Sequence, residues 1–85
     1  MTWRIEFLPS ARTELLGLDR VMQAHILRSL HRLATVPRSS ANVKALRGEA
    51  RYRLRVGDWR VIYTLRHDVL VVLVVKVAHR REAYR

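Results

Sequence analysis

Arginines that could bind a phosphate group cluster in the second half of the sequence. Residues 51–56 alternate between arginine and apolar or aromatic side chains, which is the pattern of a strand with Arg53 and Arg55 on one face. Gly57-Asp58 suits a two-residue hairpin turn, because glycine adopts the positive φ that the first position requires. This turn would place Arg60, on the returning strand, directly across from Arg55. The sequence therefore predicts a face crowded with guanidinium groups.

Such a face is unfavourable for folding alone, since like charges directly opposite each other destabilise a sheet. The same side chains could simply form the solvated face of an edge strand, which is common. The pairing of Arg55 with Arg60, together with Arg80 and Arg81 just beyond the last predicted strand, favours an anion-binding site instead. A guanidinium group can bind two phosphate oxygens at once, so a phosphate backbone is the expected ligand.

Two residues near the C-terminus could add other chemistry. His79 follows the last predicted strand and neighbours Arg80, and histidine can move protons near neutral pH. Tyr84 could stack on a nucleobase, or it could simply anchor the tail. His25 and His31 lie six residues apart on a predicted helix, which is a poor spacing for sharing a metal ion.

Neither a metal nor a cofactor has a recognisable motif in the sequence. It has no cysteine, and it lacks HExxH, P-loop and dinucleotide-binding glycine patterns. A metal-dependent nuclease needs a set of acidic ligands, and the acids from Lys44 onward are not spaced as one. We therefore expect no cofactor, and any phosphodiester chemistry is expected to be metal-free. The acids in question are Glu49, Asp58, Asp68 and Glu82.

The composition is that of a small, basic, globular protein. Its 85 residues are 49% hydrophobic and carry a formal net charge of +10, which attracts polyanions. The longest apolar run, Val69 to Val75, has seven residues, whereas a membrane-spanning helix needs roughly 20. Because the N-terminus also lacks the pattern of a signal peptide, we expect a soluble, cytoplasmic protein that does not contact a membrane.

Two helices are predicted near the N-terminus, after a strand over residues 2–8. Ser10 and Asp19 are the expected N-caps, because both side chains can accept a hydrogen bond from the first turn of a helix. Pro37 is expected to end the second helix. The predicted helices run from Pro9-Ser10 to Gly17 and from Asp19 to about Val36.

The rest of the chain is predicted to be β-structure in one domain that covers residues 1–85. The fold class is α+β with the order β-α-α-β-β-β, in which the two N-terminal helices pack on one face of a mostly antiparallel four-stranded sheet. The opposite face is expected to stay free. The later strands are expected over residues 51–56, 59–65 and 69–77, with turns at 43–46, 57–58 and 67–68 and a polar tail over 79–85.

Two stretches resemble the RelE branch of the RelE/ParE superfamily of bacterial type II toxins, and the resemblance covers nearly the whole chain. The stretches are Lys44 to Tyr63, KALRGEARYRLRVGDWRVIY, and Val77 to Tyr84, VAHRREAY. The resemblance implies a RelE-like toxin domain that cleaves messenger RNA in the ribosomal decoding site and so inhibits translation. In that reaction the ribose 2′-hydroxyl attacks the adjacent phosphate, leaving a cyclic phosphate and a free 5′-hydroxyl.

The resemblance also implies roles for individual residues. Arg53 and Arg55 match two basic strand residues that are lysines in the best-known relatives, and Arg60 matches the arginine that grips the phosphate. Arg80 matches an arginine proposed to help the leaving group, and Tyr84 matches a tyrosine that stacks on the substrate. These five are the expected catalytic residues. The further residues expected to bind RNA are Lys44, Arg51, His79 and Arg81.

Arginine in place of lysine is a departure from the pattern, because an arginine is a poor general base. We expect charge stabilisation to carry most of the rate; the alternatives are that His79 is the base or that the enzyme is weak. A ParE-like toxin that poisons DNA gyrase without cutting RNA is the main alternative function. A silent member that only binds nucleic acid or an antitoxin is another.

The resemblance further implies partners. The expected partners are the ribosome, messenger RNA in its decoding site, and a cognate RelB-like antitoxin. An acidic or amphipathic segment of the antitoxin would cover the basic site and would fold on binding. Operator DNA is expected to be bound only through the antitoxin.

Overall fold

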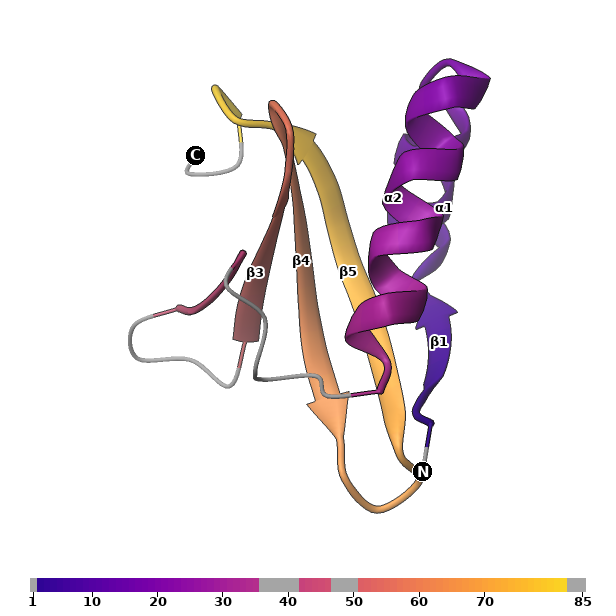
Figure 1. The fold of residues 1–85 in the computed structure, drawn as a ribbon, viewed down its shortest axis with the longest axis vertical. Helices are drawn as coiled ribbons and strands as arrows, with labels where there is room; N and C mark the ends of the chain where they lie inside the picture. Colours follow the sequence, from indigo (N-terminus) through magenta and orange to yellow (C-terminus); the bar gives the residue numbers. More distant parts are fainter. Residues whose placement is uncertain (1, 36–41, 47–50, 83–85) are drawn as a thin grey trace.

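The computed structural model describes residues 2–35, 42–46 and 51–82, which form two helices and a five-stranded sheet (Figure 1). The elements are β1 (Arg4–Phe7), α1 (Pro9–Leu16), α2 (Arg20–Leu33), β2 (Val43–Ala45), β3 (Arg51–Val56), β4 (Trp59–Arg66) and β5 (Val71–His79). The strand order is β1-β5-β4-β3-β2; β1 pairs with β5 in parallel and the other neighbours are antiparallel. The predicted α+β class is confirmed.

The strand β2 lies where the sequence predicts only a short turn. It pairs with β3, so that Lys44 lies opposite Arg53. Just before it, the carbonyl of Asn42 accepts the backbone N–H of Arg55 at 2.9 Å. The sheet therefore has five strands, and the prediction of four is wrong because it lacks β2. The three residues of β2 are too few to show the alternation by which a strand is recognised from sequence.

The helix α1 begins at Pro9 rather than after Ser10. Leu8 occupies the N-cap position and Pro9 is the first helical residue, where its missing N–H costs nothing. Ser10 therefore lies inside the first turn, and the prediction that it caps the helix is wrong. At the other end Gly17 follows the helix as predicted, and its N–H donates to the carbonyl of Thr13 at 3.1 Å.

The helix α2 begins as predicted. The carboxylate of Asp19 accepts the backbone N–H of Met22 at 2.8 Å, which satisfies one of the free N–H groups of the first turn. The helix ends at Leu33, earlier than expected. Val36 and Pro37, on which the predicted end depends, lie outside the described residues. No described helix is long and apolar enough to span a membrane.

Both helices pack on the same side of the sheet (Figure 1). Because side chains alternate along a strand, the residues between the core positions point to the opposite face. On β4, for example, Val61 and Tyr63 face the helices, and Arg60 and Ile62 face away. The core contains Leu15, Ile26, Leu30, Leu54, Val61, Tyr63, Val72, Val74 and Val77, all buried.

The strand β5 is shifted by two residues relative to the prediction. The turn before it includes Val69 and Leu70, and Leu70 adopts a positive φ of 52°. At the other end the strand continues to His79, which pairs with Trp59 of β4. An uninterrupted apolar run does not indicate where strand pairing starts, so the sequence could not fix these ends.

Glu14 of α1 contacts the C-terminal part of β5, which does not pair with β1. β1 pairs with β5 only as far as Val74. Beyond that point the N–H of Val77 donates to Glu14 Oε1 at 3.0 Å, and Lys76 Nζ lies 3.8 Å from Glu14 Oε2. The carboxylate thus accepts the hydrogen bond that a longer β1 would have accepted.

Candidate functional site

The β3–β4 hairpin has the register that the sequence predicts. Gly57 adopts a φ of +60°, which residues with a Cβ rarely adopt, and the turn brings Val56 opposite Trp59. Arg55 is therefore paired directly with Arg60. Both arginines point away from the helices, because their neighbours Val56 and Trp59 pack toward the core.

Arg60 is held by the backbone of the turn. Its Nη1 donates to the carbonyls of Gly57 and Trp59 at 2.9 and 3.0 Å. Its Nε is buried and has no hydrogen-bond partner among the described residues. A buried donor without a partner typically costs about 1–3 kcal/mol. The side chain is therefore fixed in place although its Nε donor is left unsatisfied within the described residues.

The electrostatics of Arg60 favour an anion beside it. Burial lowers the pKa of its guanidinium below the ordinary value, and nearby positive charges lower it further. These charges belong to Arg53, Arg55 and Arg80, and Asp58 acts in the opposite direction. We call these four arginines, Arg53, Arg55, Arg60 and Arg80, the arginine surface.

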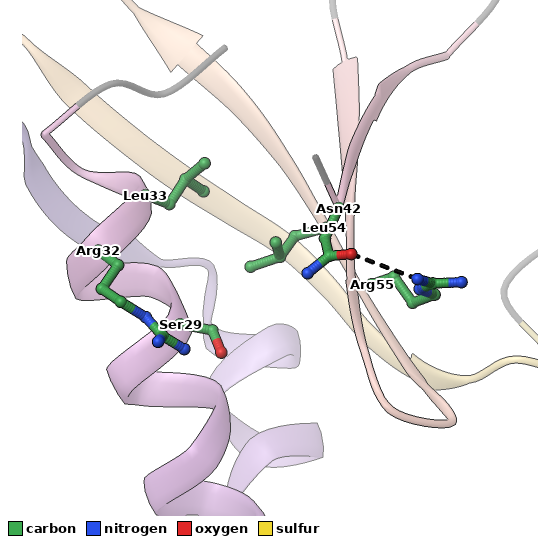
Figure 2. A pocket seen from close by; sticks show the side chains of 6 residues that line it. All are labelled: Ser29, Arg32, Leu33, Asn42, Leu54 and Arg55. Atoms are coloured by element: carbon green, nitrogen blue, oxygen red, sulfur yellow. Dashed lines mark hydrogen bonds between the residues drawn. The ribbon is translucent and has the colours of Figure 1, made fainter. Parts of the chain in front are cut away.

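Arg53 and Arg55 extend the arginine surface toward β2. Arg55 Nη2 donates to Asn42 Oδ1 at 3.3 Å (Figure 2), and Arg53 is paired with Lys44 across the strands. A hollow of about 340 Å³ lies here, lined by Asn42, Val43, Lys44, Arg53 and Arg55. Sequence reasoning proposed Lys44 but missed Asn42, because the contact of Asn42 depends on the unpredicted pairing of β2.

Arg80 reaches the arginine surface from the turn after β5. Its backbone N–H donates to the carbonyl of Asp58 at 2.8 Å, and its Nη1 lies 3.8 Å from Asp58 Oδ1. Both side chains are exposed, so this ion pair adds little to stability. The backbone hydrogen bond holds Arg80 beside the β3–β4 turn, where its charge acts on Arg60.

A comparison with protein families matches residues 5–84 of the chain to the ParE toxin of the type II toxin-antitoxin system parDE. The chain belongs to the RelE/ParE superfamily of type II toxins. Curated protein sequences give no match.

Solved structures connect this toxin with the RelE branch. The archaeal RelE–RelB complex from Pyrococcus horikoshii is 30% identical, with 98% of this chain and 100% of that chain covered and a TM-score of 0.78. The intact RelBE complex from E. coli is 26% identical, with 91% and 95% covered and a TM-score of 0.78. The isolated E. coli RelE toxin is 25% identical, with 96% and 90% covered and a TM-score of 0.81.

The remaining site residues predicted for this toxin are placed differently. His79 shares the face of its strand partner Trp59, away from Arg60, and the two rings meet edge to face at 5.5 Å. Arg51 pairs with Thr64, at the end of β3 far from the turn. Arg81 is exposed in the turn after β5, and Tyr84 lies outside the described residues.

A second hollow of the toxin, of about 290 Å³, opens between α2 and β3. Figure 2 shows Leu33 and Leu54 pointing toward each other across it, whereas the side chain of Arg55 points to the other side of β3. Within the described residues, no three His, Asp or Glu side chains gather as metal ligands. The hollow is lined by Ser29, Arg32, Leu33, Asn42, Leu54 and Arg55.

Proposed function

We propose that this toxin cleaves messenger RNA in the decoding site of the ribosome, as its resemblance to RelE toxins implies. The arginine surface supports this most strongly, because Arg55 and Arg60 oppose each other and the charges of Arg53 and Arg80 also act on Arg60. A phosphate group bound among these guanidinium groups would offset the repulsion between them. A toxin that acts on ribosomes would work in the cytoplasm.

The proposed reaction needs positive charge around one phosphodiester. The ribose 2′-hydroxyl attacks the phosphorus, the bond to the 5′-oxygen breaks, and a 2′,3′-cyclic phosphate and a free 5′-hydroxyl result. Arg60 binds a non-bridging oxygen, Arg53 and Arg55 stabilise the charge that gathers in the transition state, and Arg80 stabilises the leaving oxygen. Tyr84 stacks on a base of the substrate.

Charge stabilisation, rather than a protein base, carries most of the proposed rate. An arginine hardly ever gives up its proton, so the 2′-hydroxyl proton passes to solvent as the negative charge is neutralised, and the leaving 5′-oxygen takes a proton from solvent. His79 is not in a position to take it, since its ring lies on the face of Trp59. Lys44, Arg51 and Arg81 bind the RNA backbone on either side of the cut.

An antitoxin is the proposed partner. Two structural neighbours were solved as complexes, the RelBE complex from E. coli and the RelE–RelB complex from Pyrococcus horikoshii. The net charge of +10 favours an acidic partner. A RelB-like antitoxin would therefore cover the arginine surface with an acidic or amphipathic segment, and the complex would contact operator DNA through the antitoxin.

A ParE-like action is the second candidate, because the family match is to the ParE toxin of parDE. In that case the toxin would bind DNA gyrase and would not cut RNA. The two candidates differ in what they need from the arginine surface, since gyrase binding requires no cluster of cations around a scissile phosphate.

In vitro translation followed by primer extension, with and without ribosomes, tests the proposal. The wild-type toxin should produce cuts at defined positions within codons only when ribosomes are present. The substitution Arg60→Ala should abolish these cuts and the growth arrest of cells that express the toxin. Arrest that persists in Arg60→Ala, together with inhibited supercoiling by purified gyrase, would overturn the nuclease proposal in favour of the second candidate.

A further inference from the structure

The ring of His79 holds the turn that carries Arg80. Its Nδ1 accepts the backbone N–H of Arg81 at 3.3 Å, and its carbonyl accepts the backbone N–H of Glu82 at 2.8 Å. The ring itself is fixed against Trp59, edge to face. One residue at the end of β5 therefore binds the next turn through both its side chain and its backbone.

We infer that His79 is a positioning residue for Arg80, which deepens the proposed nuclease function and rests on it. Arg80 is tied to the β3–β4 turn by its own N–H and side chain, both of which contact Asp58. The contact from His79 to Arg81 fixes the other side of the same turn. With both sides fixed, the guanidinium of Arg80 stays beside Arg60 at the proposed phosphate site.

The same contact argues against a role for His79 as the general base. A neutral imidazole has one donor and one acceptor nitrogen. Because Nδ1 accepts the N–H of Arg81, the ring proton belongs on Nε2, and neither nitrogen offers a free lone pair. The register also places the ring on the face opposite Arg60. Both observations favour a structural role for this side chain, in which it holds the turn after β5.

Two substitutions of His79 separate the contributions of its ring. His79→Asn retains an acceptor atom at about the distance of Nδ1 but removes the aromatic ring. His79→Phe retains a ring against Trp59 but removes the acceptor. His67 offers a matched control, because it makes the same kind of edge-to-face contact with Trp3, at 5.2 Å, in the β4–β5 turn. His67→Phe should therefore leave cleavage unchanged.

The test measures kcat and KM for ribosome-dependent cleavage, and hydrogen exchange of the Arg81 amide. His79→Phe should lower kcat by about 10- to 100-fold, since small misplacements of a charged group are costly, and should change KM much less. It should also speed exchange of the Arg81 amide. His79→Asn should restore most of both. The exchange measurement stays informative if the wild-type toxin makes no cut, an outcome that would overturn the proposed function instead.

Two outcomes would overturn the inference. Unchanged kcat and unchanged Arg81 exchange in His79→Phe would mean that the hydrogen bond does not hold the turn. The second outcome is that kcat falls as much in His79→Asn as in His79→Phe, although the Arg81 amide still exchanges slowly in His79→Asn. This would mean that the ring takes part in the chemistry.

Discussion

Arg55 and Arg60 face each other directly across β3 and β4, with no acidic side chain in either paired position. Like charges in this relation destabilise an antiparallel pair. The hairpin nevertheless forms, because Gly57 supports its turn and because Val56 and Trp59, next to the arginines, pack toward the core. The fold thus tolerates a repulsive pair where the proposed substrate would bind.

Replacing Arg55 should make the toxin more stable and less active. Arg55→Thr removes the repulsion with Arg60 and introduces a residue suited to strands, so the free energy of unfolding should rise by about 0.2–1 kcal/mol. Urea denaturation measures this change. Arg66→Thr is the control, since Arg66 lies at the far end of β4 beside Asp68. If Arg55→Thr loses as much free energy of unfolding as Arg66→Thr, or more, then Arg55 and Arg60 do not destabilise the hairpin by repulsion.

Replacing Arg60 with lysine, which keeps the positive charge but not the planar guanidinium, should not preserve cleavage activity. In Arg60→Lys the ammonium group lacks the planar guanidinium that contacts two backbone carbonyls through Nη1 and can also bind two phosphate oxygens at once. We expect kcat for cleavage to fall by about 100-fold, the scale on which loss of a transition-state donor acts. Single-turnover primer extension measures it. Activity within a few-fold of wild type would show that charge alone suffices.

Binding of single-stranded RNA should depend on salt through the arginine surface. Each arginine that neutralises a phosphate contributes about 0.7 to the slope of log affinity against log salt concentration. Arg53→Ala and Arg80→Ala should each make the slope shallower by about that amount. Arg28→Ala, which removes an exposed charge from α2, should leave it unchanged. Fluorescence anisotropy over a salt series gives the slopes, and equal slopes in all variants would rule out the proposed contacts.

Removing Glu14 should destabilise the fold without touching the proposed site. Glu14→Ala leaves the N–H of Val77 without its acceptor, and an unpaired, partly buried donor costs about 1–3 kcal/mol. Glu14→Gln keeps an oxygen acceptor and should cost less. Glu6→Ala breaks only the exposed ion pair with Arg4 and serves as the control. Thermal denaturation measures all three, and a change in Glu14→Ala no larger than in Glu6→Ala would contradict this role of Glu14.

The sequence predicts the hairpin well because two local patterns agree there. The alternation of residues 51–56 sets the faces, and Gly57-Asp58 sets the register, so the pairing of Arg55 with Arg60 follows without tertiary information. Asp19 as a helix cap is predictable for the same reason, since the contact is local.

What the sequence could not predict depends on contacts between distant segments. β2 forms because Val43–Ala45 meets the edge of β3, and β5 reaches His79 because Trp59 is there to pair with it. The contact of Asn42 with Arg55 needs the same long-range pairing. The sequence neighbours of His79 predict contact with RNA, and only the register of β4 and β5 places its ring on the face of the sheet opposite Arg60.

The parallel pairing of β1 with β5 has a consequence for how the toxin is made. Arg4 pairs with Val71, so β1 has no neighbour in the sheet until the segment 71–79 has been synthesised. β5 lies between β1 and β4, and contacts so far apart in sequence close late and slowly. A nascent chain released before that segment would lack β5, the strand that joins β1 to β4, and would also lack Arg80. On the proposed mechanism, incomplete products of translation would therefore lack activity.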